Sequence, residues 1–232
     1  MRLILLSLSG LLVAAISYSQ QVPINFSDAI KPHLNKYNLQ SDIEFERGNL
    51  EKGLFLFDSL VQNYLVGSRF TDYALKNVHG GKVRLGKIKK PIFLITYASW
   101  CVLSRGQISA LNKLSRKYSG DVQFVVLFWD RRSNVRKIAR KFSGQIKVCY
   151  ANERYRNDSN IVSTLKHTLG FPTSYYLNGA LEVIDIKRGG VTALGNSTYL
   201  TDFNLNYKVF NDRLTEFLIK KNQVKTQLAT AE

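Results

Sequence analysis

Two cysteines, Cys101 and Cys149, carry most of the chemistry that this sequence can offer. Cys101 follows an apolar run that ends at Tyr97 and precedes a stretch with helical periodicity, so its sulfur should lie near the N-terminus of a helix. The positive end of a helix dipole stabilises a thiolate, which is the nucleophilic form of cysteine. We therefore predict a lowered pKa and a reactive thiol at Cys101, against the alternative of a buried structural cysteine.

Alternating strand and helix patterns must position this cysteine. Apolar runs and two-residue alternation predict strands at 69–75, 83–85, 91–97, 122–129, 145–150, 174–177 and 181–186. Helical spacing predicts helices at 104–118, 134–142, 161–169 and 207–220, whereas 49–57 could be helix or strand. The Gly80-Gly81 stretch predicts one hairpin turn, and Asn178-Gly179 predicts a second, of two residues. The order predicts an α/β fold with its functional groups at the carboxyl ends of the parallel strands.

The N-terminus has the pattern of a secretory signal peptide over 1–19. Arg2 precedes an apolar run and small residues, which predicts a mature chain that begins near Gln20. The run is shorter than the roughly 20 apolar residues of a membrane-spanning helix, and we expect no span in the mature chain. We divide the rest into an N-terminal extension (20–65), a main domain (66–220) and a polar C-terminal tail (221–232). The predicted location is the periplasm or the extracellular space, most simply a bacterial envelope.

The formal net charge of +16 favours acidic partners, anionic surfaces or colloidal solubility. We expect no nucleic-acid partner, because the basic residues are scattered and no nucleic-acid motif accompanies them. The basic group from Arg131 to Lys141 is interpreted as the solvated face of a helix.

Several motifs together resemble the exported TlpA-like branch of the thioredoxin superfamily, the thiol:disulfide oxidoreductases. The resemblance covers roughly Val66 to Lys220. It is carried by Gly67-x-x-Phe70-x-x-Tyr73-x-Leu75, the Gly80-Gly81 turn, Leu85, the strand to Ala98-x-Trp100-Cys101, and Gly170-Phe171-Pro172-Thr173 with Asn178-Gly179. It implies a thioredoxin-like fold, with a central mixed β-sheet flanked by helices and an additional strand-helix unit at 145–169.

The resemblance also implies the residues of the site. Pro172 would be cis and would pack against the turn that holds Trp100 and Cys101, where it helps to bind an extended partner chain. We assign Cys101, Ser104 and Pro172 to the catalytic site. Trp100, Phe171 and Thr173 are assigned to substrate binding.

Three departures from the family pattern alter the predicted mechanism. Relatives usually carry Cys-x-x-Cys, whose second thiol resolves the mixed disulfide with the substrate, and this chain has Ser104 there. Gln107 occupies the position of a glutamate that tunes proton transfer in many relatives, and Ser109 that of a common proline. We expect the two-cysteine cycle to be absent.

Three functions remain open at this stage. Cys101 could act alone as a monothiol reductase or isomerase on protein or small-molecule thiols and disulfides. Cys149 could serve as a distant resolving cysteine, provided that the two α-carbons lie within about 7 Å. The chain could instead be a redox-inactive binding or scaffold module for an acidic envelope partner.

Other chemistry finds little support in the sequence. His33, His79 and His167 lack metal-ligand spacing, and we predict neither a metal site nor a cofactor. No feature brings a histidine to Cys101 as a cysteine hydrolase would require. Ser163 and Lys166 have the spacing of a Ser-x-x-Lys pair, which we attribute to chance within a predicted helix.

Overall fold

One mixed sheet of seven strands organises the chain. The computed structural model describes residues 23–98, 100, 106–188 and 198–229, with 221–229 described by backbone alone. The predicted signal peptide, Cys101 and Ser104 thus lie outside the described residues. The strands are β1 (Ala74–Asn77), β2 (Lys82–Arg84), β3 (Ile92–Tyr97), β4 (Gln123–Trp129), β5 (Ile146–Ala151), β6 (Thr173–Leu177) and β7 (Val183–Arg188). Their order in the sheet is β2-β1-β5-β4-β3-β6-β7.

The pairing directions follow from the sequence patterns. β3, β4 and β5 are parallel neighbours, whereas β1 pairs antiparallel with β2 and β5, and β6 pairs antiparallel with β3 and β7. The central strands are continuous apolar runs, and all six residues of β3 are buried. Such runs are typical of strands that are covered on both faces.

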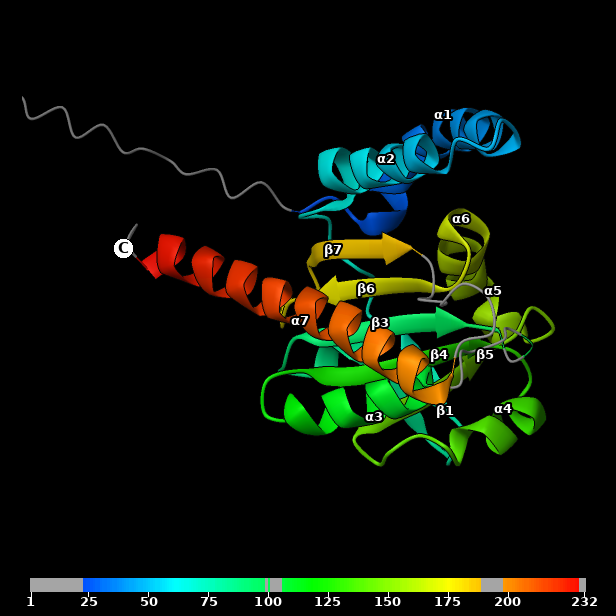
Figure 1. The fold of residues 1–232 in the computed structure, drawn as a ribbon, viewed down its shortest axis with the longest axis vertical. Helices are drawn as coiled ribbons and strands as arrows, with labels where there is room; N and C mark the ends of the chain where they lie inside the picture. The colour runs from blue at the N-terminus through cyan, green and yellow to red at the C-terminus, as the bar shows by residue number, and fades with distance from the viewer. Residues whose placement is uncertain (1–22, 99, 101–105, 189–197, 230–232) are drawn as a thin grey trace, which may run out of the picture.

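Helices cover both faces of this sheet. One face carries α3 (Gln107–Lys117), α4 (Arg132–Ala139) and α7 (Tyr199–Ala229), which enclose a core with Phe93 and Phe124. The other face carries α1 (Phe26–Glu46), α2 (Leu50–Leu60), the π-helix η1 (Val61–Leu65) and the continuous segment α5 (Ser159–Ile161), η4 (Val162–Lys166) and α6 (His167–Leu169). Figure 1 shows α7 lying across the sheet beside α3, with the α1–α2 pair next to β7. Short 3-10 turns are η2 (Leu85–Lys87) and η3 (Arg156–Asp158).

The segment before the predicted main domain belongs to the same core. Residues 49–57, which could be helix or strand by periodicity, fall in α2, where the Asn49 side chain accepts a hydrogen bond from the backbone N–H of Lys52. Phe26 and Phe57 are buried in one cluster with Tyr175 of β6, and the Phe26 and Tyr175 rings meet edge to face at 6.1 Å. The α1–α2 pair is therefore part of the packing that holds the sheet.

Most predicted elements are present, with shifted boundaries. The hairpin around Gly80-Gly81 is formed by β1 and β2, but β1 begins at Ala74 rather than residue 69. Arg69 instead makes single bridges to Asn25 and Glu182, which join the start of α1 to the β6–β7 connection. The last helix spans 199–229, beyond the predicted 207–220 at both ends. None of the described helices is both long and apolar enough to cross a membrane.

The prediction of a two-residue turn at Asn178-Gly179 is wrong. The backbone N–H of Asn178 bonds to the carbonyl of Glu182, so three residues form the loop, and Leu181 adopts φ 63°. A three-residue hairpin loop needs a left-handed residue at its third position. Leu181 fills that position although it is not glycine, because its side chain, 5% exposed, packs into the core. Burial of the Leu181 side chain therefore outweighs the usual preference for glycine at this turn position.

The strand order and the helices on both faces confirm the predicted fold class. The chain has an α/β thioredoxin-like fold, with a central mixed sheet flanked by helices and additional helices at its N-terminus.

The side chain of Asn178 stabilises the β6–β7 loop. Its Oδ1 accepts from the backbone N–H groups of Ala180 and Glu182, both at 2.9 Å, and its Nδ2 donates to the Glu182 carboxylate at 2.7 Å. Asn178→Ala should lower the free energy of unfolding by about 1–2 kcal/mol, because it leaves these groups without their partner. Urea denaturation measures the change. Glu182→Gln, which keeps an acceptor oxygen for the Asn178 amide and leaves the two backbone bonds in place, should lose less, and equal losses in the two variants would contradict this account.

Candidate functional site

The predicted site lies at the carboxyl end of β3. This strand ends at Tyr97, Trp100 lies three residues further along the chain, and α3 begins at Gln107 with Gly106 as its N-cap. Cys101 and Ser104 are in the sequence between Trp100 and Gly106, outside the described residues. The described neighbours therefore define the surroundings of the site.

Trp100 and the Phe171–Pro172 pair form an exposed aromatic surface at this end of the sheet. The Trp100 side chain is 72% exposed, and its ring meets that of Phe171 edge to face at 5.6 Å and 78°. The Phe171–Pro172 peptide bond is cis, the isomer that the family resemblance implies. Two residues predicted from separate motifs, 71 positions apart in the chain, are thus in contact. Phe171 is half-buried against the core, so the exposed part of this pair is mainly the Trp100 ring.

Thr173, which we assigned to substrate binding, is fully buried. Its hydroxyl donates to the carbonyls of Leu169 and Gly170, and its backbone N–H donates to the Thr96 hydroxyl at 3.2 Å. Thr96 in turn donates to the Thr173 carbonyl. Thr173 therefore fastens the Pro172 segment to β3, and its side chain is not presented to a ligand.

Gln107 provides a neutral polar group beneath the start of α3. The residue is 3% exposed, and its Nε2 donates to the Tyr97 hydroxyl at 2.9 Å. The sequence indicated that this position does not titrate, but it gave no sign of Tyr97 as the partner. The pair joins the last residue of β3 to the first residue of α3 without a charge.

Gly106 allows α7 to approach the start of α3. A methyl group at this position would lie 2.1 Å from the backbone nitrogen of Phe203 and 2.4 Å from its Cα. The same two helices also meet through Lys113, whose ammonium lies over the rings of Phe203 and Tyr207 at 5.6 and 4.9 Å. No sequence pattern indicated Gly106, because a closely packed glycine and a loop glycine have the same kind of neighbours along the chain.

Arg188 connects the N-terminal helices to the same region. It pairs with Thr173 in the sheet, its guanidinium donates to the Tyr37 hydroxyl, and it lies over the Phe57 ring at 5.5 Å. Burial raises the pKa of Tyr37, and the nearby Arg188 charge opposes this shift. No sequence pattern indicated this contact, since Tyr37 and Arg188 are 151 residues apart.

Cys149 lies in the core, in β5. Its side chain is 0% exposed, within the cluster that includes Leu127 and Leu165. Burial raises the pKa of its thiol to about 12, although the nearby Lys147 charge opposes the shift. A resolving cysteine must reach the mixed disulfide as a thiolate, and this environment disfavours the thiolate.

Three other residues noted in the sequence, Ser163, Lys166 and His167, form hydrogen bonds within the protein. Ser163 donates to the Asn160 carbonyl, while Lys166 and His167 both bind the Glu153 carboxylate, so Ser163 and Lys166 do not form a catalytic pair. These hydrogen bonds lower the pKa of Glu153, with the bond from Lys166 as the larger cause. Lys166 also lies 6.0 Å from the centre of the Phe171 ring, which places a cation beside the aromatic surface.

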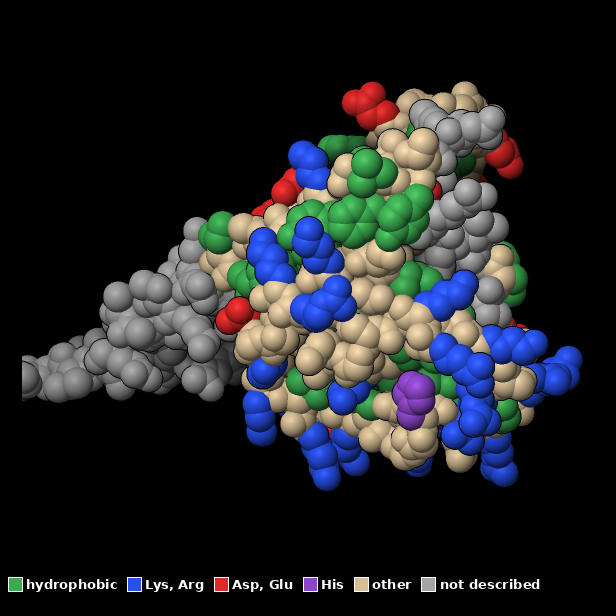
Figure 2. All heavy atoms as spheres, turned by 60° about the horizontal axis from the view of Figure 1, so that its bottom comes forward, with side chains coloured by type: hydrophobic (Ala, Val, Ile, Leu, Met, Phe, Trp, Pro, Cys, Tyr) green, Lys and Arg blue, Asp and Glu red, His purple; other side chains and the backbone are tan. Residues whose placement is uncertain are grey.

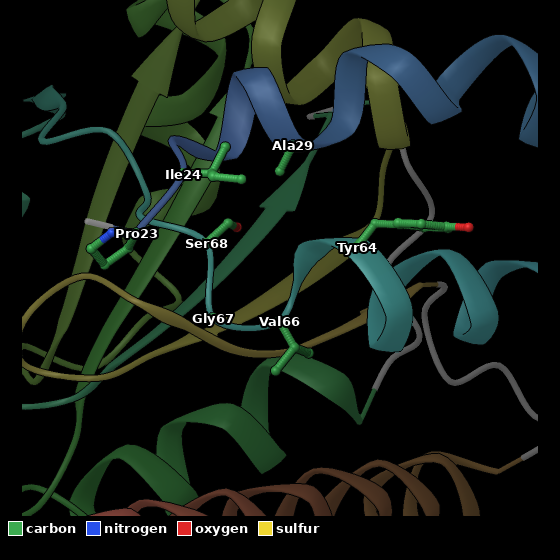
Figure 3. A pocket seen from close by; sticks show the side chains of 7 residues that line it. All are labelled: Pro23, Ile24, Ala29, Tyr64, Val66, Gly67 and Ser68. Atoms are coloured by element: carbon green, nitrogen blue, oxygen red, sulfur yellow. The ribbon is translucent and has the colours of Figure 1, made fainter. Parts of the chain in front are cut away.

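A separate hollow of about 560 Å³ lies between the start of α1 and the end of η1. Figure 3 shows its lining, which is Pro23, Ile24, Ala29, Tyr64, Val66, Gly67 and Ser68. The Ser68 hydroxyl already donates to the Leu65 carbonyl at 2.6 Å, which leaves the lining largely apolar. None of these residues comes from the β3–α3 connection or the Pro172 segment, so the hollow is not part of the predicted site.

Of the comparisons with known proteins, only the one with solved structures found similar proteins. No family model matches the sequence, and no curated protein matches it. The similar structures include the thioredoxin domain of a thiol-disulfide oxidoreductase from Bacteroides vulgatus (13% identity, 63% of this chain and 96% of that chain, TM-score 0.48). They also include an uncharacterized conserved protein from Geobacillus kaustophilus (19%, 59% and 76%, TM-score 0.48) and StoA from Bacillus subtilis (16%, 52% and 89%, TM-score 0.40).

The close contact at Gly106 predicts a strong effect of one methyl group. Gly106→Ala should lower the free energy of unfolding by about 2–3 kcal/mol, because the clash is with the α7 backbone rather than with a flexible side chain. Urea denaturation measures this effect. Gly120→Ala is the matched control, since a methyl group there meets nothing within 4 Å and should change stability by less than about 0.5 kcal/mol. Similar effects of the two changes would refute the close approach.

The burial of Cys149 predicts an inert thiol in the folded protein. In a Cys101→Ala variant, whose remaining cysteine is Cys149, an alkylating reagent at pH 8 should label almost no protein, because a pKa of about 12 leaves roughly one thiol in 10,000 ionised. Mass spectrometry measures the labelled fraction. Unfolding in guanidinium chloride should restore full labelling. Equally fast labelling of the folded and unfolded chains would show that Cys149 is accessible.

Proposed function

We propose that this chain carries out thiol–disulfide exchange through Cys101 alone, as a monothiol reductase or isomerase. The observation that carries the proposal is the contact of the exposed Trp100 with Phe171, the neighbour of Pro172, at the carboxyl end of β3. Cys101 follows Trp100 directly in the sequence. A peptide that lies across the aromatic surface would therefore pass close to the residue that precedes the thiol.

The reaction needs the Cys101 thiolate and further thiols that the site itself does not supply. The Cys101 thiolate attacks one sulfur of a substrate disulfide, which forms a mixed disulfide and releases the other substrate sulfur as a thiolate that takes up a proton. A second thiolate then attacks the substrate sulfur of the mixed disulfide and releases the Cys101 thiolate. If this thiolate belongs to an external thiol, the substrate sulfur becomes disulfide-bonded to that thiol, and a second external thiolate then displaces the substrate. The substrate leaves with both sulfurs reduced, and the two external thiols leave as a disulfide. If it belongs to the substrate itself, the disulfide is rearranged without net oxidation or reduction.

Ser104 and Cys149 support the single-cysteine form of this reaction. A serine at position 104 has no thiol with which to displace the substrate. The buried Cys149 thiol, with a pKa of about 12, is a poor replacement for a resolving cysteine. Release of the substrate would therefore depend on a thiol from outside the chain's own site.

The N-terminal end of α3 supports the activation of Cys101. A thiolate close to a helix N-terminus is stabilised by the helix dipole, and Gln107 adds a neutral amide rather than an opposing carboxylate. Cleavage near Gln20 and export would place this chemistry in a compartment where disulfides persist. Substrates there would be proteins or small molecules with disulfides.

The proposal is tested by trapping mixed disulfides. Wild-type protein incubated with a peptide disulfide should form an adduct at Cys101, since no thiol at position 104 removes it, and Cys101→Ala should form none. Cys149→Ala is the control and should trap as wild type does. Ser104→Cys should convert trapping into turnover, read as insulin-disulfide reduction. A Cys101 pKa near 8.5 or above, without any adduct, would instead favour a redox-inactive binding module.

A further inference from the structure

The outer face of α4 carries an unusual concentration of positive charge. We call this surface the α4 ridge, and its members are Arg131, Arg132, Arg136, Lys137, Arg140 and Lys141, all of them exposed. The opposite side of the helix holds the buried Val135 and Ala139 in the core. Figure 2 shows Lys and Arg side chains spread over the face that carries α3 and α4, with few acidic side chains among them. The predicted solvated helix face is present, but its composition calls for an explanation.

No described carboxylate neutralises the ridge. In the part of the chain that the structure describes, none of its six side chains forms an ion pair with Asp or Glu. The nearest acid in sequence, Asp130, accepts from the backbone N–H of Arg131 and from the Asn134 side chain. Arg132 donates its Nε to the Val78 carbonyl at 3.0 Å, which fixes one end of the ridge.

Two cations on the neighbouring helix α3 make contacts within the protein. Lys113 lies over the rings of Phe203 and Tyr207, and Lys117 donates to the Asn211 side chain at 2.8 Å. Both therefore help to hold α7. The ridge cations lack such partners among the described residues apart from Arg132, so α4 and its flanking residues gather five cations with no partner side chain in a stretch of eleven residues.

This arrangement opposes the stability of the free helix. Arg132, Arg136 and Arg140 are spaced four residues apart, so like charges are neighbours along one side of α4. Arg131 and Arg132 also place positive charge at the helix N-terminus, where the dipole favours negative charge. A bound anionic group would relieve both effects. Arg136 and Lys137, in the last turn, are by contrast favourably placed for the helix dipole. The unfavourable part of the ridge is therefore its first turn and the arginines four residues apart.

The dimensions and composition of the ridge favour carboxylates on a short segment. The eight residues of α4 span roughly 12 Å, and the flanking Arg131, Arg140 and Lys141 extend the ridge to roughly 16 Å. Helical side chains four residues apart are about 6 Å apart along the axis. Four of the six cations are arginines, whose planar guanidinium can bind a carboxylate through two hydrogen bonds. None of the described residues between Trp100 and Tyr199 is a large exposed apolar side chain, so the ridge offers neither a membrane-inserting residue nor a platform for stacking bases.

We propose that the α4 ridge is a docking surface for an acidic polypeptide segment of a partner protein. The segment would present several Asp or Glu side chains along roughly 16 Å, in an extended or helical conformation. Arg131 and Arg132 directly follow β4, whose carboxyl end lies beside that of β3, so a docked partner would lie close to the edge of the sheet that carries Trp100. The proposal uses no residue of the thiol reaction, and the two proposals can fail independently.

Fluorescence anisotropy with a labelled oligoglutamate peptide tests the proposal on the full mature chain. A triple variant, Arg136→Glu, Lys137→Glu and Arg140→Glu, should lower the affinity at least about tenfold at low salt, and added salt should weaken binding to wild type. The control triple variant, Lys82→Glu, Lys87→Glu and Lys89→Glu, changes the net charge equally at exposed positions outside the ridge and should lower the affinity by less than about threefold. The corresponding Gln variants should show the same ranking if the Glu variants fold poorly.

Three outcomes would overturn the proposal. The first is no binding of oligoglutamate to the wild-type protein. The second is an equal loss of affinity in the ridge and control variants, which would indicate an effect of net charge alone. The third outcome concerns binding to vesicles that contain phosphatidylglycerol, which is measured for comparison. Stronger, ridge-dependent binding to these vesicles than to oligoglutamate would assign the surface to anionic lipid instead. Trapping at Cys101 in the ridge variant should match wild type, which separates this test from that of the thiol reaction.

Discussion

The structure depends on the need to cover β3 on both faces. Phe93 and Ile95 point into the core beneath α3, α4 and α7, whereas Ile92 and Leu94 point into the core that contains α1 and α2. A strand whose side chains are all buried cannot lie at a solvated surface without a large loss of hydrophobic free energy. The N-terminal helices therefore complete the fold, although the sequence suggested an extension to a domain that begins near Val66.

The same packing determines the surroundings of the candidate site. α7 covers one face so closely that its backbone contacts the N-cap of α3, which requires glycine at position 106. On the other side, Thr173 and Thr96 bind the Pro172 segment to β3 by hydrogen bonds. The groups that hold the site are neutral, including the pair formed by Gln107 and Tyr97. The described charge beside the aromatic surface is the Lys166 ammonium, 6.0 Å from the centre of the Phe171 ring.

Positive charge has two different roles on the same face of the molecule. On α3, Lys113 and Lys117 contact aromatic and amide groups of α7 and so contribute to the fold. On α4, the arginines and lysines face outward while Val135 and Ala139 anchor the helix to the sheet. A net charge of +16 gives no information about this division, because it sums charges that support the fold with charges that are open to a partner.

The sequence by itself determined the fold class, the buried central strands, helix α3 and the separate motifs that hold Trp100 and Pro172. These features follow from periodicity within short windows, where burial imposes a regular pattern. Tertiary structure alone decided that α1 and α2 join the core, that Thr173 and Cys149 are buried, that Leu181 replaces a turn glycine, and that Arg188 binds Tyr37. Each of these depends on packing between segments that are distant in the chain, and short-range patterns cannot encode such contacts.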